Sequence, residues 1–255
     1  MERWARAKYQ PVLPLGEDGH RVTGSREHIE LSKDAAKEGM VLLKNQGNVL
    51  PLARGSRVAL FGKATFDYVK GGGGSGDVTV AYTRNLYEGL KKKADHVEIF
   101  EELADFYREN VKGQYAQGRG PGMTVEPVLP EELLQKARAF TDTAIISICR
   151  FSGEGWDRKS VYDRKGKADD TVIAGQEQKQ DDEEEVFEEG DFYLTHGEKA
   201  MVEAVKASFK KVIVVMNVGG MVDTDWFVRD HGIQSVLMAW QGGLEGGLAA
   251  AELLV

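Results

Sequence analysis

The 255-residue sequence has little of the chemistry that disulfide frameworks and metal sites need. It contains one cysteine, Cys149, and five histidines that never form an HxxxH or HExxH pair. Neither a disulfide nor a multi-cysteine metal site can therefore form within the chain, and we expect no metal and no cofactor. No run of about 18 apolar residues occurs, which excludes a helix that spans a membrane.

An export signal and a basic surface are also missing. The first ten residues, MERWARAKYQ, lack the apolar core and the cleavage site of a secretory signal, so we expect a cytoplasmic protein. The net charge is −8 and the isoelectric point is near 5.3, whereas nucleic-acid binders usually carry a basic patch. We therefore expect neither a nucleic acid nor a membrane as a partner.

The acidic excess is confined to residues 180–191 (QDDEEEVFEEGD), which hold eight acids and no base. Without those eight, 33 acids balance 33 bases. Because like charges repel one another, we expect residues 159–190 to form a solvated acidic insertion, disordered in part, and not a core element. A lid or a segment that docks a partner is the functional alternative.

Short β-branched runs alternate with segments of helical periodicity through the rest of the chain. We expect strands at 57–61, 96–100, 143–149, 212–218 and 233–240, and helices at 26–45, 84–93, 103–111, 131–140, 195–209 and from 244 onwards. The strands are near-continuous apolar runs, which is typical of a parallel sheet covered on both faces. This indicates an α/β fold with one doubly wound, mostly parallel sheet of about five to six strands and helices on both faces. We expect residues 1–255 to form a single domain that begins with an N-terminal arm at 1–24.

In such a sheet a ligand binds beyond the carboxyl ends of the strands. Four glycine-bearing segments are expected there: Gly62–Gly76, Arg150–Arg158, Gly219–Asp225 and Gln241–Glu245. The GGGGSG run within the first suggests a phosphate cradle, but it does not match GxxxxGK(S/T) and starts about ten residues after its strand. We interpret it as a flexible loop or as the border of a sugar pocket. A nucleotide-binding, Rossmann-like enzyme is the alternative, although it needs a glycine turn directly after the first strand.

The motif SGEGWDR at Ser152–Arg158 carries the most chemistry. Glu154 lies between two glycines just after a strand, where a short turn places its carboxylate at the ligand edge. A carboxylate in that position suits proton donation to a leaving group. Trp156 can stack on the apolar face of a sugar, and Arg158 can bind hydroxyls or orient a carboxylate. The alternative is a surface turn with a solvated Glu154 and an ion pair between Asp157 and Arg158.

Six segments follow one another in a recognisable order and spacing. They are Ala35–Leu52 (AAKEGMVLLKNQGNVLPL), Val58–Gly62 with Gly71–Gly76, Asp142–Arg158 (DTAIISICRFSGEGWDR), Gly190–Leu194 (GDFYL), Lys211–Asp223 (KVIVVMNVGGMVD) and Val236–Gly247 (VLMAWQGGLEGG). Together they resemble the α/β-sandwich domain of glycoside hydrolase family 3, a family rich in β-glucosidases. The resemblance covers about residues 26–255.

The resemblance implies a retaining glycosidase whose site is divided between two domains. A (β/α)₈ barrel of the same polypeptide would supply the nucleophilic aspartate, and Glu154 would be the acid/base that acts on a β-glycoside substrate. The glycine loop of the family borders the sugar pocket, and the residues after the glutamate either line the leaving-group side or shape the turn. The residues of this chain that correspond to these two sets are Gly73, Gly74, Ser75, Gly76, Trp156, Asp157 and Arg158.

Two departures from the family pattern affect function. A barrel of about 250 residues is missing from this chain, so we expect the chain alone to be inactive. The acidic insertion at 159–190 has no counterpart of that length in shorter relatives. Because the sandwich follows the opening methionine at once, we hypothesise that the parent protein encodes the sandwich before the barrel. A non-catalytic scaffold or interaction domain is the competing hypothesis.

Overall fold

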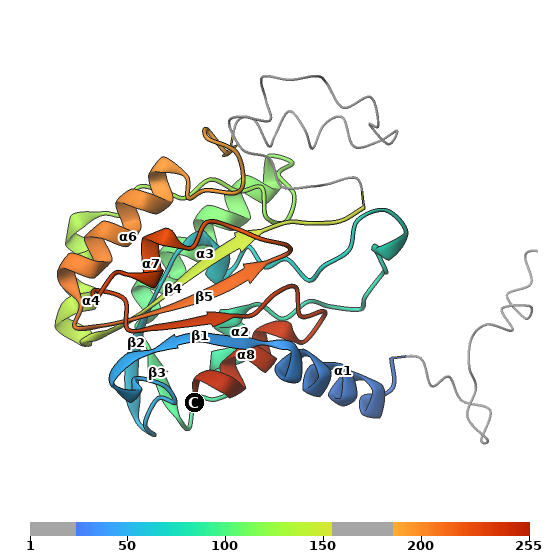
Figure 1. The fold of residues 1–255 in the computed structure, drawn as a ribbon, viewed down its shortest axis with the longest axis horizontal. Coiled ribbons are helices and arrows are strands. Elements are labelled where there is room, and N and C mark those ends of the chain that lie inside the picture. Colours follow the sequence, from blue (N-terminus) through green and yellow to red (C-terminus); the bar gives the residue numbers. More distant parts are fainter. Residues whose placement is uncertain (1–23, 155–185) are drawn as a thin grey trace, which may run out of the picture.

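The computed structural model of the chain describes residues 24–154 and 186–255 (Figure 1). Its elements are α1 (Arg26–Gly39), β1 (Val41–Asn45), η3 (Gln46–Asn48), β2 (Ser56–Phe61), η4 (Lys63–Thr65), η5 (Gly74–Gly76), α2 (Leu86–Lys91), β3 (Val97–Ile99), α3 (Glu101–Ala116), α4 (Glu131–Phe140), β4 (Thr143–Arg150), α6 (His196–Ser208), β5 (Lys211–Val218), α7 (Asp225–Val228), β6 (Ser235–Met238) and α8 (Gly246–Leu254). No helix in these two stretches is long and apolar enough to cross a membrane.

Six strands form one sheet in the order β1-β6-β5-β4-β2-β3. All neighbouring pairs are parallel except β1 and β6, which run antiparallel. The central pair, β4 and β5, stays in register from Thr143 opposite Lys211 to Arg150 opposite Val218. Both strands are almost entirely buried, which is the reason for their continuous apolar sequence. The predicted doubly wound, mostly parallel sheet is confirmed.

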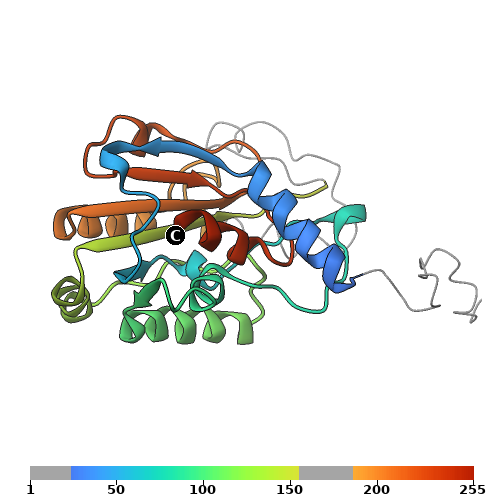
Figure 2. The same cartoon turned by 90° about the horizontal axis from the view of Figure 1, so that it is seen from below.

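Alternate residues of the strands pack into two separate cores, one on each face of the sheet. One core joins the strands to α3, α4 and α6, and the other joins them to α2 and α8. Along β5, for example, Val214 faces the first core and Val215 the second. Figure 2 accordingly shows α8 in front of the sheet and α6 behind it. The prediction of helices on both faces is confirmed.

The helix predicted over residues 26–45 is too long. It ends at Gly39, and Val41–Asn45 form the antiparallel edge strand β1 instead. Pairing with β6 gives the backbone of this segment its hydrogen bonds, and the Lys44 ammonium donates to the carbonyls of Phe227 (2.9 Å) and Asp230 (2.6 Å). Apolar residues at positions 40 and 43 fit either structure, so periodicity alone did not separate them.

The end of the acidic insertion also differs from the prediction. Residues 159–185 lie outside the described part of the chain, but Val186 and Phe187 are buried and do not belong to a solvated loop. The Phe187 ring packs against Met123 and lies 4.7 Å from the Arg150 guanidinium. Burying an aromatic ring over a planar cation is favourable, and this contact fixes the start of the second described stretch against the end of β4.

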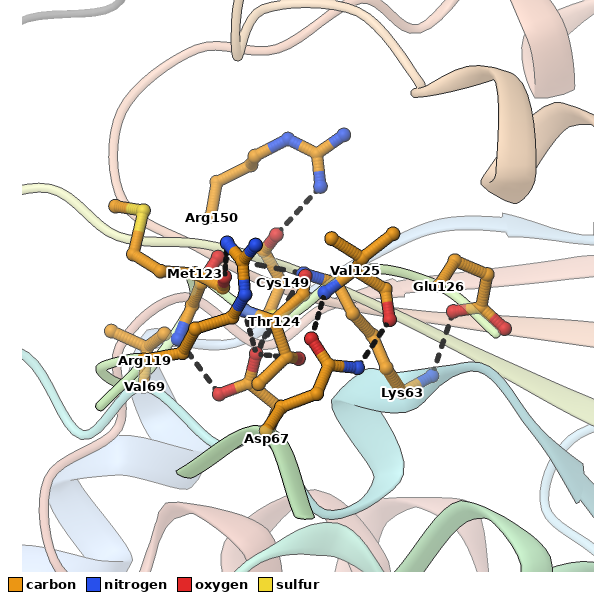
Figure 3. A network of polar contacts seen from close by, with 12 residues as sticks. Lys63, Asp67, Val69, Arg119, Met123, Thr124, Val125, Glu126, Cys149 and Arg150 are labelled. Atoms are coloured by element: carbon orange, nitrogen blue, oxygen red, sulfur yellow. Dashed lines mark hydrogen bonds and ion pairs between the residues drawn. The ribbon is translucent and has the colours of Figure 1, made fainter. Parts of the chain in front are cut away.

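Behind the carboxyl ends of β2 and β4 lies a buried polar network (Figure 3). The Asp67 carboxylate accepts hydrogen bonds from the Gly122 N–H (2.7 Å) and the Thr124 hydroxyl (2.6 Å), and lies 3.7 Å from the Lys63 ammonium. The Lys63 backbone N–H donates to the Glu126 carboxyl at 2.8 Å. These bonds attach the segment around residues 122–126 to the loop that follows β2.

A second buried pair fixes the end of β4. Arg150, which is 1% exposed, donates to both carboxylate oxygens of Glu198 at 2.8 and 2.6 Å. Glu198 also forms a capping box with Thr195 at the start of α6. Burial opposes ionisation of Glu198, but Arg150 outweighs it and holds the pKa of that carboxyl below its ordinary value. The last residue of β4 is thereby tied to the first turn of α6.

The buried carboxyl of Glu126 should make the protein less stable as pH rises. Burial raises the pKa of this carboxyl from the ordinary 4.5 to about 8. Between these two values the folded chain holds a proton that the unfolded chain has released, so this group lowers the free energy of unfolding as pH rises. Glutamine is neutral at every pH, so we expect Glu126→Gln to lack this loss. The free energy of unfolding of the variant, relative to wild type, should rise by about 1.4 kcal/mol per pH unit between the two pKa values.

Thermal or urea unfolding of the two proteins from pH 5 to pH 8 measures this difference. The exposed Glu38 provides the matched control, because Glu38→Gln removes a carboxyl that faces solvent. An equal response of both variants to pH would contradict the assignment to Glu126.

Candidate functional site at the carboxyl edge of the sheet

All four segments predicted at the ligand edge meet there, within the parts of them that the structure describes. The Val69 N–H donates to the Asn217 side chain at 2.8 Å, which joins the loop after β2 to the end of β5. The Asn217 amide donates in turn to the Trp240 carbonyl at 2.7 Å, beyond β6. Gly219 lies so close to Ser152 that an added methyl carbon would come within 2.6 Å of its Cβ. The loops after β2, β4, β5 and β6 therefore form one continuous surface.

The glycine loop, residues Gly71–Gly76, touches the turn that carries Glu154. Gly73 has φ +118° and approaches Gly153 so closely that a Cβ would lie 2.6 Å from the Gly153 Cα. Gly74 has φ +56°, and a Cβ there would collide with the Glu154 side chain. A residue with a side chain at Gly73 or Gly74 would therefore meet strain and a collision at once. The structure brings Gly73 and Gly74 together with Glu154, and η5 spans the adjoining residues up to Gly76.

Glu154 itself lies at the surface, just after the buried strand β4. Its side chain lies against the backbone of Gly74 in the glycine loop. Trp156, Asp157 and Arg158, which the sequence also indicated, lie outside the described residues. Cys149, five residues earlier, is fully buried and packs as a small core residue, and burial raises the pKa of its thiol.

A cleft of about 560 Å³ opens beside the glycine loop. Gly71 and Asp77 border it on one side and the segment from Tyr115 to Met123 on the other. Phe66, Tyr68 and Phe151 contribute aromatic surface to its walls. Aromatic faces of this kind stack on the apolar faces of sugars, so the cleft provides suitable surface next to the turn of Glu154.

The loop directly after β2 is not built to hold a phosphate group. Its leading N–H, that of Lys63, donates to the buried Glu126 carboxyl, and the N–H groups of Thr65 and Phe66 bond to backbone carbonyls of the same loop. A phosphate cradle needs such N–H groups to point at the ligand. Nothing here favours the nucleotide-binding alternative. In residues 24–154 and 186–255, moreover, no three His, Cys, Asp or Glu side chains gather as a metal site would require.

A polar cluster at this edge was not predicted from the sequence. It consists of Glu245, Tyr82 and Arg84. Glu245 is 6% exposed and binds Tyr82 and Arg84, which lie about 160 residues earlier in the chain. The glycines that follow Glu245 in QGGLEGG were the available signal, because glycines allow the close backbone approach that buries such a group. Partners so far apart in sequence show no spacing pattern.

The comparisons with known proteins agree with this architecture. The family described as the glycosyl hydrolase family 3 C-terminal domain matches residues 40–255. The chain is 60% identical to beta-glucosidase A of Butyrivibrio fibrisolvens over 100% of this chain and 30% of that protein. It is 31% identical to a beta-glucosidase of Ruminococcus albus over 90% of this chain and 22% of that protein.

Solved structures show the same likeness. Beta-glucosidase 3B from Thermotoga neapolitana, in complex with glucose, superposes with a TM-score of 0.72 at 30% identity. The match covers 92% of this chain and 30% of that one. The chain thus spans less than a third of the length of these relatives. By sequence and by fold, the chain belongs to glycosyl hydrolase family 3, in which it corresponds to the C-terminal domain.

Proposed function

We propose that this chain supplies the acid/base of a retaining β-glucosidase-type glycoside hydrolase and that Glu154 is that residue. The observation that carries the proposal is the contact between Gly73–Gly74 and Gly153–Glu154, which places a carboxylate at the ligand edge. The relatives named above are beta-glucosidases, and a β-glycoside is therefore the substrate class that we infer. A (β/α)₈ barrel in the rest of the polypeptide would supply the nucleophile.

The reaction needs two carboxyl groups about 5–5.5 Å apart on either side of the glycosidic bond. Glu154 would donate a proton to the leaving oxygen while the barrel carboxylate attacks the sugar. It would then remove a proton from the water that releases the glycosyl group. Because a general acid must hold its proton near the working pH, it needs a pocket that excludes water. Glu154 is exposed in this chain, so docking of the barrel would have to cover it.

Trp156, Asp157 and Arg158 follow Glu154 directly, and we place them on the leaving-group side of the same pocket. Ser75 and Gly76 continue the glycine loop beyond Gly74, and we assign them to the border of the sugar pocket. The cleft beside Gly71 extends the surface available to the leaving group.

A non-catalytic docking domain is the competing function. Val41, Leu42 and Leu43 of the edge strand β1 are 44–49% exposed, which is much apolar surface for an edge strand. A docked barrel and an unrelated partner are both compatible with this exposure. The role of Glu154 separates the two functions, because a docking domain does not need that carboxyl group.

Glu154→Gln tests the proposal in the full-length protein, meaning this chain joined to its barrel. We expect hydrolysis of alkyl β-glucosides, which need a proton on the leaving oxygen, to fall by about 100-fold to 10,000-fold. Formation of the glycosyl-enzyme from 2,4-dinitrophenyl β-glucoside should change little, because that leaving group departs without a proton. Pre-steady-state release of dinitrophenolate measures this step.

Glu98→Gln on β3 is the matched control, since it removes an exposed carboxylate at the far edge of the sheet. The 255-residue chain alone, assayed in parallel, should show no glycosidase turnover. Full activity of Glu154→Gln on alkyl glucosides would refute the acid/base assignment.

Gly74→Ala tests the contact on which the proposal is based. A methyl group at Gly74 would collide with the Glu154 side chain, so we expect the carboxylate to move and the rate on alkyl glucosides to fall about tenfold or more. Gly55→Ala is the control, because Gly55 also has a positive φ (+81°) but no heavy atom within 4 Å of an added Cβ. Equal rates for the two variants would show that the contact does not position Glu154.

A further inference from the structure

The glycine loop is reached through residues 68–70, which we call its outgoing limb, and left through residues 77–84, which we call its returning limb. Both limbs attach to one short segment, residues 241–247, which runs from the loop after β6 into the first turn of α8. On the outgoing limb, the Tyr68 hydroxyl donates to the Gly243 carbonyl (3.1 Å), and the Gly243 N–H donates to the Lys70 carbonyl (2.8 Å). On the returning limb, the Arg84 N–H donates to the Leu244 carbonyl at 2.8 Å, and the Gly247 N–H donates to the Arg84 carbonyl at 3.1 Å. The position of the loop therefore depends on this segment.

One buried carboxylate adds side-chain bonds to the returning limb. Glu245 accepts hydrogen bonds from the Tyr82 hydroxyl at 2.5 Å and from Arg84 Nε and Nη2 at 2.6 and 3.3 Å. Charge-assisted, two-pronged bonds of this kind are among the strongest in proteins and fix the orientation of both partners. Burial opposes ionisation, but Arg84 and Tyr82 outweigh it and hold the pKa of the Glu245 carboxyl below its ordinary value. The charge is therefore present at neutral pH.

The backbone around Glu245 is shaped for this contact. Any side chain at Gly246 would collide with the Tyr68 hydroxyl, and any side chain at Gly247 would collide with the backbone of Asn85. These glycines let Tyr68 and Asn85 approach the start of α8, next to the buried Glu245. Between the limbs, the Lys70 ammonium reaches the Asp77 carboxylate at 3.0 Å and the Val78 carbonyl at 3.1 Å.

We propose that Glu245, through Arg84 and Tyr82, is a positioning residue that holds the glycine loop against the turn of Glu154. The chain of contacts runs from Glu245 to the returning limb, along the loop to Gly73 and Gly74, and from there to Gly153 and Glu154. The expected effect on the hydrolysis rate rests on the proposed function of Glu154. The expected effect on hydrogen exchange in the loop does not.

Glu245→Gln in the full-length protein tests both consequences. The substitution keeps the size of the side chain and removes the charge that Arg84 binds. Hydrogen exchange of the amides of residues 72–82, followed by mass spectrometry, should become at least threefold faster. The rate on alkyl β-glucosides should fall about tenfold, and dinitrophenolate release from 2,4-dinitrophenyl β-glucoside should fall less than twofold, because a displaced acid affects only substrates that need its proton.

Glu252→Gln is the matched control. Glu252 lies on the same helix α8 and binds Lys33, Lys37 and Lys93 at 2.8–3.2 Å, so its loss weakens the helix without touching the loop. It should leave both exchange and the ratio of the two rates unchanged. Tyr82→Phe, which removes one hydrogen bond from a side chain that is 39% exposed, provides a milder variant and should shift both readouts in the same direction.

The outcomes separate the two proposals. Faster exchange together with the selective loss on alkyl glucosides supports the positioning role in catalysis. If exchange is faster in Glu245→Gln but Glu154→Gln retains full activity, Glu245 still positions the loop. In that case the acid/base assignment of Glu154 is rejected. Unchanged exchange in Glu245→Gln and Tyr82→Phe, or equal effects of Glu252→Gln, would overturn the inference.

Discussion

The site depends on one backbone contact, the approach of the glycine loop to the turn after β4. Gly73 and Gly153 lie too close for either to carry a side chain, and the Gly73 backbone has a positive φ that other residues rarely adopt. A contact between two backbones does not vary with side-chain rotamers. It therefore fixes where the Glu154 turn lies relative to the loop, and loops far apart in sequence become one surface.

The polar groups behind that contact explain how irregular loops stay in place at the end of a sheet. Burying charges is costly unless each is paired and hydrogen-bonded, and here they are paired across elements. Arg150 and Glu198 tie β4 to α6, and the ion pair of Lys63 with Asp67 is hydrogen-bonded to the segment around residues 122–126. Removing one member would leave its partner buried and unpaired, so the network favours a single arrangement of the edge.

The sequence predicted what local patterns control. Continuous apolar runs indicated the parallel sheet, its two helical layers and the edge where Glu154 lies. Local patterns did not distinguish β1 from a continued helix, because the pairing of Val41 with Met238 on β6 decides that question. Likewise, the burial of Phe187 over Arg150 inside an acidic stretch and the binding of Arg84 by Glu245 depend on residues that only the fold brings together.

Among the glutamates at or behind this edge, Glu245, Glu126 and Glu154 have surroundings that suit them to different tasks. Glu245 is held ionised by Arg84 and Tyr82, so it has no proton to donate near neutral pH. Glu126 retains a proton up to a pKa of about 8, but it is buried behind Lys63, where no substrate reaches it. Glu154 alone of the three stands at the surface beside the cleft. An acid/base must exchange its proton with a substrate, and of these three positions only that of Glu154 meets the requirement.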